Sequence, residues 1–295
     1  MPLTVLVSCA MDLVWRIPAF PRPGQSIAEA KFQRFPGGKG ANQAVQAARL
    51  GAEVTAIGCV GDDEFGKVIL DILRQDGVDA VGVRVVPGVS TATAGIYVEA
   101  SGQNTICIDL GANRCVTETD VTTHMPAANE NLVLSQLEIP AEATLAAAQR
   151  GRLCLNPAPA APIADEIWAR TWLFVPNQTE AGFYVQAPVR HLEEAREAAR
   201  QLLARGPQHV VITMGDQGAY WQNRAGEEFF APAPKVDAVD TVAAGDSFCA
   251  ALAVSLDQGN DFPVALSYAV RVASLSVTRS GAMPSLPYRH EIGAN

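Results

Sequence analysis

The sequence predicts an α/β fold in which a doubly wound, mostly parallel sheet carries helices on both faces. Apolar, β-branched runs such as residues 3–9 are typical of strands buried on both faces. Such runs alternate with segments of helical periodicity over most of the 295 residues, which favours parallel strands joined by crossover helices. Polar clusters directly follow several of the strands, as expected where ligands bind at the carboxyl edge of a parallel sheet.

The composition is that of a globular chain and excludes several classes of function. Hydrophobic residues make up 48% and charged residues 18%, which argues against disorder. The formal net charge of -9, without a basic run, argues against nucleic acid or an anionic membrane surface as the main partner. No apolar run reaches the roughly 18 residues of a membrane span. The short apolar N-terminus is followed at once by Asp12 and lacks the features of a signal peptide.

The six cysteines form no C-x-x-C pair, and no histidine stands at metal-ligand spacing from them. We therefore expect neither a disulfide framework nor a zinc site. Unpaired thiols fit a reducing compartment, so a cytoplasmic location is expected.

The first half of the chain alternates strands and helices but contains two excursions. Strands are expected over residues 3–9, 53–60 and 78–86, with helices opening near residue 40 and over residues 64–75. A Pro-rich segment, 16–36, and a hairpin over 93–99 and 105–110, turning at Ser101 and Gly102, interrupt the alternation. We interpret excursions at about 11–36 and 92–110 as a small β-sheet, a lid, on one α/β domain that spans residues 1–295.

The second half alternates more regularly. Strands are expected over residues 132–136, 153–155, 172–175, 208–213, 219–222 and 228–230. Helices are expected over residues 141–149 and 191–204 and near 245–257 and 263–277.

The stretch 237–248 (Asp-Ala-Val-Asp-Thr-Val-Ala-Ala-Gly-Asp-Ser-Phe) carries the most specific chemistry. It predicts a turn of small residues leading into a helix near Gly245, and the free N–H groups at a helix start bind anions, phosphate above all. Ala243, Ala244 and Gly245 let an anion approach the backbone closely. Asp246, in the same turn, is a candidate general base. The alternative is that Asp246 or Ser247 merely caps the helix.

Two earlier segments place further polar groups at the same edge of the sheet. Asp12 follows the first strand, where a polar ligand would bind; alternatively it makes a local turn. Residues 37–42 (Gly-Gly-Lys-Gly-Ala-Asn) open a helix, so their N–H groups can face a ligand while Asn42 projects from the first turn. The segment lacks Walker A spacing, and the alternative is an ordinary Gly-rich turn.

With these clusters, the chain resembles the ribokinase-like (PfkB) family of sugar kinases over about residues 3–292. The motifs that carry the resemblance are residues 37–44, 156–159, 176–180, 240–246 and 277–282. The resemblance implies an ATP-dependent transfer of the γ-phosphate to a primary hydroxyl of a pentose, with D-ribose converted to D-ribose 5-phosphate as the expected reaction. It makes Asp246 the catalytic base and the N–H groups of Ala243, Ala244 and Gly245 the anion hole.

The resemblance also assigns binding residues. For the sugar pocket they are Asp12, Gly38, Lys39, Gly40, Asn42, Glu138 and Asp246. For the nucleotide they are Asn177, Glu180, Thr213, Gly215, Asp216, Gly218, Gly245 and Val270. Glu180 is further expected to influence a magnesium site through water, although a first-turn helix carboxylate is the simpler interpretation.

A monovalent cation, usually potassium, is implied beside the anion hole. By match its ligands come from Asp240, Val242, Ser276, Arg279, Gly281 and the hydroxyl of Ser285. The family resemblance further implies a homodimer formed through the lid, with sugar and ATP as small-molecule partners.

Two positions depart from the pattern of the family's ribose kinases. Ala10 stands where their sugar pocket has an Asn, so one sugar hydroxyl loses a partner, and this puts D-ribose in doubt more than kinase activity. Val270 stands where they have a His near the adenine. Alternatives that stay open are a kinase for deoxyribose, another pentose, a ketohexose or a nucleoside, a non-catalytic sugar or nucleotide sensor, and a glycosidase.

Overall fold

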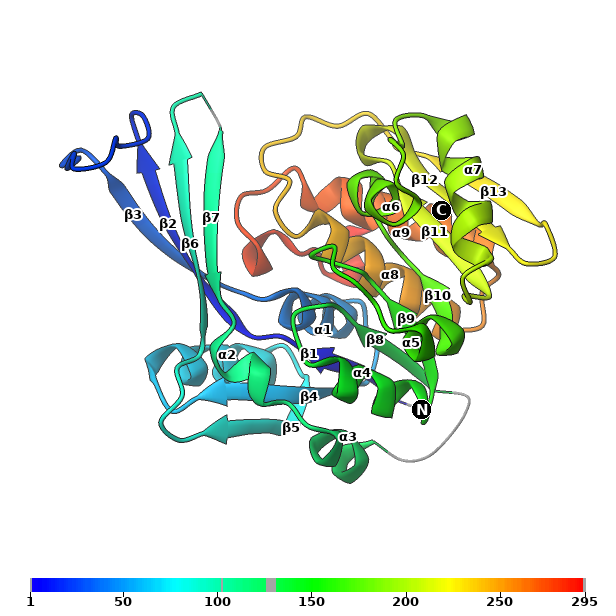
Figure 1. Ribbon diagram of the computed structural model, residues 1–295, viewed down its shortest axis with the longest axis horizontal. Coiled ribbons are helices and arrows are strands. Elements are labelled where there is room, and N and C mark those ends of the chain that lie inside the picture. The colour runs from blue at the N-terminus through cyan, green and yellow to red at the C-terminus, as the bar shows by residue number, and fades with distance from the viewer. Residues whose placement is uncertain (1, 102, 126–130, 294–295) are drawn as a thin grey trace.

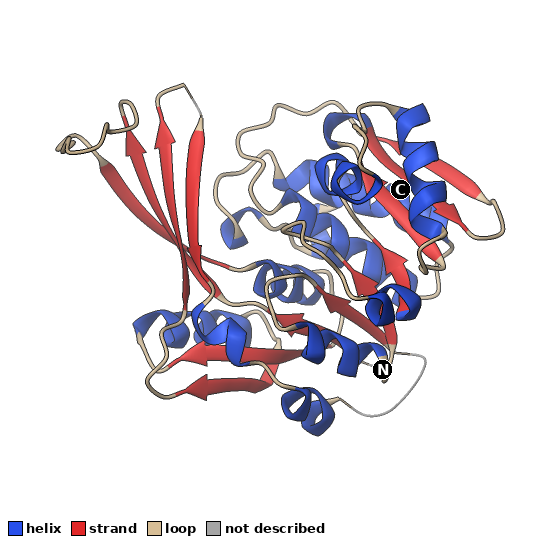
Figure 2. Cartoon of the chain, in the orientation of Figure 1, coloured by secondary structure: helices blue, strands red, loops and turns tan. Residues whose placement is uncertain are grey.

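The computed structural model describes residues 2–101, 103–125 and 131–293 (Figure 1). These residues form a nine-stranded sheet covered by helices and a separate four-stranded sheet (Figure 2). The large sheet has the order β13-β12-β11-β10-β9-β8-β1-β4-β5. Its strands are β1 (Leu3–Val7), β4 (Val54–Gly61), β5 (Asp79–Val86), β8 (Leu132–Ser135), β9 (Arg152–Leu155), β10 (Thr171–Phe174), β11 (His209–Thr213), β12 (Gly218–Asn223) and β13 (Glu228–Pro232).

The strands from β11 to β5 run parallel, and only the β12 pairings with β11 and β13 are antiparallel among the described strands of this sheet. The predicted doubly wound α/β fold is thus confirmed. The chain enters at β1, in the middle of the sheet, proceeds to β4 and β5 on one side and returns to β8 on the other. The sheet therefore reverses its winding between β1 and β8, the position where open parallel sheets bind ligands.

Helices cover both faces of the sheet. One hydrophobic cluster packs α1 (Lys39–Arg49), α2 (Glu64–Gln75), α8 (Ala244–Asp257) and α9 (Phe262–Ser276) against one face. Two further clusters pack the opposite face beneath α3 (Glu118–His124), α4 (Ala141–Ala148), α5 (Asp165–Arg170), α6 (Gln178–Val185) and α7 (Leu192–Leu203). Strand β1 shows why the sequence pattern is continuous: Leu3, Val5 and Val7 belong to the first cluster, whereas Leu6 belongs to the other side.

The small sheet has the order β3-β2-β6-β7 and projects away from the large one at the left of Figure 1. Its strands are β2 (Ala10–Ile17), β3 (Lys31–Gly37), β6 (Ala92–Glu99) and β7 (Asn104–Asp109). On one of its faces Trp15 lies against Phe32 and Tyr97, with ring centroids 4.9 and 5.3 Å apart. Aromatic cross-strand pairs of this kind stabilise a sheet and fix its register. Gly102, expected in the β6–β7 turn, lies outside the described residues.

The corner after β4 is bonded to the start of β6. Asp63 caps α2 through Gly66 and also accepts hydrogen bonds from the N–H and hydroxyl of Thr91, at 2.7 Å each. The N–H of Gly61 donates to the same hydroxyl. These bonds lower the pKa of Asp63 although burial opposes the shift. The third strand of the small sheet is thus anchored to the large one at Thr91.

Asp12 follows β1 as predicted, but the alternative that it makes a local turn is wrong. It lies inside β2 and pairs with Phe35 of β3 and Ala94 of β6. The signal was present as period-2 alternation, because Met11, Leu13, Trp15 and Ile17 occupy one face of this strand.

Three short helices, α3, α5 and α6, were not predicted. Capping boxes open α3 at Thr117 and α6 at Asn177, so a Ser/Thr/Asn-x-x-Asp/Glu search would have found both of these helices.

Candidate active site

The entrance to α1 packs directly on the end of β1, which explains its glycines. A Cβ on Gly40 would lie 2.5 Å from Cα of Val7, and a Cβ on Gly38 would lie 2.4 Å from the carbonyl oxygen of Ser8. Gly38 also has a φ of 95°, which an L side chain rarely adopts. The contact between helix and strand, rather than open space for a ligand, therefore excludes side chains at both positions.

The N–H groups of this entrance were expected to face a ligand, and three of them do not. Lys39 donates its N–H to Glu138, Gly40 donates to the hydroxyl of Ser8, and Ala41 donates to the carbonyl oxygen of Ser8. Oε2 of Glu138 also accepts a 2.6 Å hydrogen bond from Ser8 Oγ. Since Ser8 and Glu138 accept hydrogen bonds from these N–H groups, Lys39 and Asn42 contribute to the site through their side chains.

Asp246 lies in the first turn of α8, and that helix start has no side-chain cap. Its N-cap residue is Ala243, in the left-handed region at φ 60°. The alternative that Asp246 or Ser247 caps the helix is thus wrong. The N–H of Ala244 donates to Thr241 O at 3.3 Å, whereas that of Gly245 makes no backbone hydrogen bond within the described chain. An uncapped helix start with free N–H groups suits an anion.

The carboxylate of Asp246 points away from its own helix toward α1. Nδ2 of Asn42 donates to its Oδ2 at 2.8 Å, and Nε2 of Gln43 donates to its Oδ1 at 3.3 Å. The residue is 7% exposed. Burial raises the pKa of Asp246 to about 6, against the opposing effects of the Lys39 ammonium and the two amide donors. The group thus titrates close to neutral pH, as a general base does.

Asp12, on the small sheet, belongs to the same charge cluster. Burial, together with the carboxylates of Glu138 and Asp246, raises the pKa of Asp12 to about 6, while Lys39 opposes the shift. Burial alone would lower the pKa of Lys39, but the carboxylates of Asp246, Glu138, Glu180 and Asp12 together raise it. One half-buried ammonium therefore lies among four carboxylates, which come from β2, the segment after β8, α6 and α8.

A pocket of about 210 Å³ opens beside this cluster. It is lined by Lys39, Asn156, Ala158, Val175, Asn177, Glu180, Thr213, Thr241, Ala243, Gly245, Asp246 and Cys249. The structure thus brings together residues that were predicted for the anion hole, the sugar and the nucleotide. Cys249 was not predicted: it stands one turn of α8 after Gly245, so helical spacing would have indicated it. Burial raises its pKa far above the usual range of a thiol, so it lines the wall as an uncharged group.

The predicted nucleotide residues separate into those at the pocket and those apart from it. Asn177 pairs with Thr213 in an isolated bridge, which holds the ends of β10 and β11 together. Glu180 forms a capping box with Asn177, so the simpler interpretation of its carboxylate is correct, and it also lines the pocket. Burial raises the pKa of Glu180.

Four predicted nucleotide residues are not among those that line this pocket. Gly215 and Asp216 form a short turn after β11, and Gly218 begins β12. Val270 is buried within the hydrophobic cluster between α8, α9 and the sheet, because its side chain is on the inner face of α9. An adenine contact by Val270 is therefore not supported by its position.

Two loops predicted to hold a monovalent cation are bonded to each other. Asp240 accepts hydrogen bonds from the N–H groups of Val242 and Gly281, both at 3.0 Å, and Val239 donates to Val277 O. Arg279 pairs with Glu291 through its side chain, and the hydroxyl of Ser285 donates to Ala282 O. Ser276 ends α9 at the same loop. In the described chain, no cluster of three His, Cys, Asp or Glu side chains could hold a metal.

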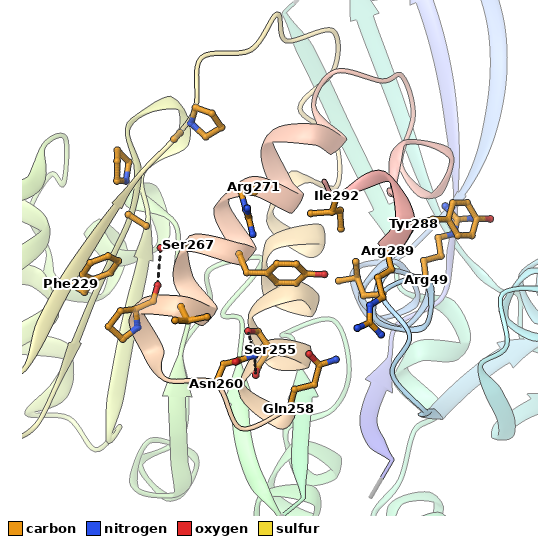
Figure 3. A pocket seen from close by; sticks show the side chains of 18 of the residues that line it. Arg49, Phe229, Ser255, Gln258, Asn260, Ser267, Arg271, Tyr288, Arg289 and Ile292 are labelled. Atoms are coloured by element: carbon orange, nitrogen blue, oxygen red, sulfur yellow. Dashed lines mark hydrogen bonds between the residues drawn. The ribbon is translucent and has the colours of Figure 1, made fainter. Parts of the chain in front are cut away.

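A larger groove of about 1420 Å³ lies on the outer side of α8 and α9, between β13 and the C-terminal segment (Figure 3). Ser255, Gln258 and Asn260 are at one end, and Arg271 and Arg289 point into it. None of the residues predicted for catalysis or binding lines this groove. The candidate site is therefore the smaller pocket, which lies at the ends of β9, β10 and β11 beside the starts of α1 and α8.

The chain matches the model of the pfkB family carbohydrate kinases over residues 3–289. It is 36% identical to a ribokinase of Haemophilus influenzae, with 98% of this chain and 96% of the relative covered. It is 35% identical to a deoxyribokinase of Salmonella typhi, over 97% of this chain and 96% of that one.

Solved structures agree with the sequence relatives. A ribokinase from Thermotoga maritima superposes with a TM-score of 0.89 at 33% identity, covering 99% of this chain and 98% of that one. A ribokinase from Arabidopsis thaliana, complexed with ribose and ATP, superposes with a TM-score of 0.88 at 29% identity, covering 99% and 97%. Among the described residues, no helix is both long and apolar enough to cross a membrane.

Proposed function

The chain belongs to the PfkB family of carbohydrate kinases, and from that premise we propose that it phosphorylates D-ribose at its primary hydroxyl, with ATP as donor. The products are D-ribose 5-phosphate and ADP. The observation that carries the proposal is the position of Asp246, a buried carboxylate beside an uncapped helix start, both at one pocket. A phosphotransferase acting on a sugar hydroxyl needs this pair of groups: a base for the hydroxyl proton and donors for the phosphate charge.

In the proposed reaction, Asp246 is the base that receives the proton of the sugar hydroxyl. The sugar hydroxyl loses its proton to the carboxylate, its oxygen forms a bond to the γ-phosphorus, and the bond from that phosphorus to the ADP oxygen breaks. The free N–H of Gly245 stabilises charge on the transferred group, and such donors are typically worth roughly 3–4 kcal/mol. The remaining lowering of the reaction barrier comes from placing the sugar hydroxyl in line with the bond that breaks at the γ-phosphorus, and the sugar pocket provides this placement.

For the sugar pocket we propose Asp12, Asn42 and Glu138, with Gly38, Lys39 and Gly40 forming its floor. Oδ1 of Asn42 is buried and accepts no hydrogen bond within the described chain, so it is available to a sugar hydroxyl. Carboxylate and amide groups suit the neighbouring hydroxyls of a polyol, because they accept or donate hydrogen bonds. For ATP we propose Asn177, Glu180, Thr213, Gly215, Asp216 and Gly218 along the ends of β10 and β11.

A second candidate substrate is 2-deoxy-D-ribose, and the side chain at position 10 favours it. Ala10 and Asp12 are two residues apart on β2 and hence on the same face of the strand. Ala10 has no polar group for a hydroxyl, and a deoxy sugar lacks one such hydroxyl. One of the relatives, at 35% identity, is a deoxyribokinase.

A coupled assay of ADP release over D-ribose, 2-deoxy-D-ribose, a ketohexose and a nucleoside tests the substrate. The proposal predicts the highest kcat/KM for D-ribose. A higher value for the deoxy sugar would transfer the assignment to the second candidate, and no ATP-dependent turnover of any compound would contradict both. Ala10→Asn is the matched variant: it should raise the preference for D-ribose over 2-deoxy-D-ribose, since it restores a polar partner.

We further propose that magnesium and potassium take part. Magnesium would accompany the ATP phosphates and contact Glu180 through water, since Mg²⁺ keeps most of its own waters. Potassium would be held by the carbonyls of Asp240, Val242, Ser276, Arg279 and Gly281 and the hydroxyl of Ser285. Replacing K⁺ by Na⁺ at constant ionic strength should lower kcat, and an unchanged kcat would contradict the cation site.

We propose that the small sheet is a lid that closes over the sugar and pairs with the lid of a second copy in the cytoplasm. Phe32, Tyr97, Ile106 and Ile108 are large apolar side chains exposed on it. Ile108 pairs with Ala94, which pairs with Asp12, so Ile108 and Asp12 share the face toward the site. Sedimentation should show a dimer that Ile108→Asp dissociates; a monomer at micromolar concentration would contradict the interface. The six free cysteines suit a reducing compartment.

A further inference from the structure

Three buried amide side chains, Gln43, Gln136 and Asn156, form a hydrogen-bonded chain that links Asp246 to the sheet. Gln43, on α1, donates from Nε2 to Asp246 Oδ1 and to Asn156 Oδ1, at 3.3 Å each. Its own Oε1 accepts a 2.6 Å hydrogen bond from Nε2 of Gln136, directly after β8. Gln43 and Gln136 are fully buried, and Asn156 is 8% exposed. Each amide thus bonds a neighbour in a setting without competing water.

The orientations of Asn156 and Gln43 are determined by their neighbours. Nδ2 of Asn156 donates to the backbone carbonyl of Val175 at 2.9 Å, and a carbonyl can only accept. Oδ1 of Asn156 therefore faces Gln43 and requires a donor there. The NH₂ of Gln136 faces the other end of Gln43 and requires an acceptor. Both conditions are met only when the NH₂ group of Gln43 faces Asp246.

Gln43, which is fully buried and is not among the residues that line the pocket, thus presents a neutral donor to the carboxylate. Asn42 contacts the other carboxylate oxygen, so both oxygens are held from α1. A neutral donor favours the charged form of a carboxylate without placing a competing cation beside the transferred phosphate. The bond also fixes the rotation of the carboxyl group, which decides whether a lone pair faces the sugar hydroxyl.

We propose that Gln43, oriented by Gln136 and Asn156, is a positioning residue that keeps the carboxylate of Asp246 ionised and aimed at the reacting hydroxyl. The inference rests on the proposed role of Asp246 as base. The competing interpretation is purely structural: the amides merely satisfy one another and hold α1 against the sheet. The two interpretations differ in what happens to the pH profile and to kcat.

The decisive variant is Gln43→Met, which keeps the length of the side chain and removes its polar atoms. We expect kcat to fall about 10- to 100-fold, the size of effect that misplacement of a catalytic group produces. KM for the sugar should change less than about threefold, because Gln43 is not among the residues that line the pocket. The acidic limb of the kcat/KM profile should move to higher pH, since a donor to the carboxylate is lost.

Thr144→Val is the matched control. Thr144 is buried at 1% exposure and shares a 2.9 Å hydrogen bond with Ser135, away from Asp246. Thr144→Val should lower Tm through the loss of a buried hydrogen bond but keep the pH profile and kcat of the wild type. If Thr144→Val shifts the profile as much as Gln43→Met does, the effect is general loosening and the proposal is wrong.

Gln136→Met provides a second variant that does not touch Asp246. It should reproduce a smaller part of the kcat loss, and the double variant should resemble Gln43→Met alone, because both act through one network. Additive losses, or a folded Gln43→Met protein with unchanged kcat and pH profile, would overturn the inference. Asp246→Asn distinguishes failure of the proposed function from failure of this inference. If Asp246→Asn retains turnover, Asp246 is not the base. If Asp246→Asn is inactive but the glutamine variants retain full turnover, only the positioning role of Gln43 is wrong.

Discussion

Nδ2 of Asn42 donates to Oδ2 of Asp246 at 2.8 Å, a hydrogen bond between residues 204 positions apart in the chain. It joins the first turn of α1 to the first turn of α8. The positive ends of two helix dipoles therefore converge on one carboxylate. This convergence explains how a buried Asp, Lys39 and an uncapped helix start can share a small pocket.

Asp246→Asn should abolish turnover while leaving sugar binding intact. The amide has the shape of the carboxylate but cannot accept the hydroxyl proton, and loss of a general base costs typically about 10²- to 10⁴-fold. ADP release measures the first effect, and titration calorimetry with the sugar measures the second. Asp246→Asn with more than a tenth of the wild-type kcat would contradict the role of this residue as base.

The pH profile of kcat/KM should show an acidic limb near pH 6. The base must be ionised to accept a proton, and burial raises the pKa of Asp246 to about 6. A second carboxyl titrates in the same range, because the pKa of Asp12 is also about 6 and is raised in part by the carboxylate of Asp246. Activity should thus be lost as pH falls through about 6. A profile that stays flat to pH 4.5 would mean that neither carboxyl titrates in the catalytic range.

The fold could be predicted largely from the sequence, whereas the contacts within the site could not. Continuous apolar runs revealed the buried strands, and the motif around Asp246 indicated its helix start. Gln43 was overlooked because its chemistry depends on Gln136 and Asn156, which the fold alone brings near. Sequence position says which strand end a side chain follows, but not which donors reach it.

The glycines at the entrance of α1 are a second case in which the sequence alone does not predict the contacts. A Gly-rich helix start is compatible both with ligand contact and with close packing. At Gly40 packing is decisive, since a Cβ would lie 2.5 Å from backbone atoms of β1. Close packing between segments that are far apart in the chain leaves no local signal in the sequence.

The ionisation of Asp246 should also appear in thermal stability. Its folded-state pKa, about 6, is above the value of 3.8 for an unperturbed Asp, so between these pH values the folded protein binds more protons than the unfolded one. The contribution of this group to the free energy of unfolding therefore falls as pH rises through that window. Relative to Asp246→Asn, the wild type should be more stable at pH 4 than at pH 8. A difference in Tm that does not vary with pH would contradict the raised pKa.

Ala243 should tolerate glycine but not valine. Its φ of 60° is costly for a side chain, by about 1–2 kcal/mol for L residues, and more for a β-branched one. Ala243→Gly removes this cost but gains freedom in the unfolded chain, so Tm should change little. Ala243→Val should lower Tm and, by displacing the first turn of α8, lower kcat. Equal Tm values for the two variants would show that the left-handed conformation is not required.

Arg49 should matter for catalysis from a distance, through the segment that carries Ser285. Its guanidinium pairs with Asp76 and also donates to the carbonyls of Met283 and Leu286, at 2.8 and 2.9 Å. Arg49→Met removes the hydrogen bonds to Met283 and Leu286, which we call the Arg49 clamp. It also leaves the carboxylate of Asp76 without its ion-pair partner, at a place where both side chains are about nine-tenths buried. Breaking such a pair costs roughly 3–5 kcal/mol, so Tm should fall clearly.

The same variant bears on the proposed cation site, because the freed segment includes the hydroxyl of Ser285. At a temperature where Arg49→Met is folded, the potassium concentration needed for half-maximal activity should rise, while KM for the sugar stays near the wild-type value. Arg49→Met/Asp76→Leu is the control, since it removes the unpaired carboxylate and should recover part of the Tm without restoring the clamp. If potassium dependence recovers together with Tm in the double variant, the effect on the cation is a consequence of instability. If it stays shifted, the carbonyls held by Arg49 are what positions the cation loop.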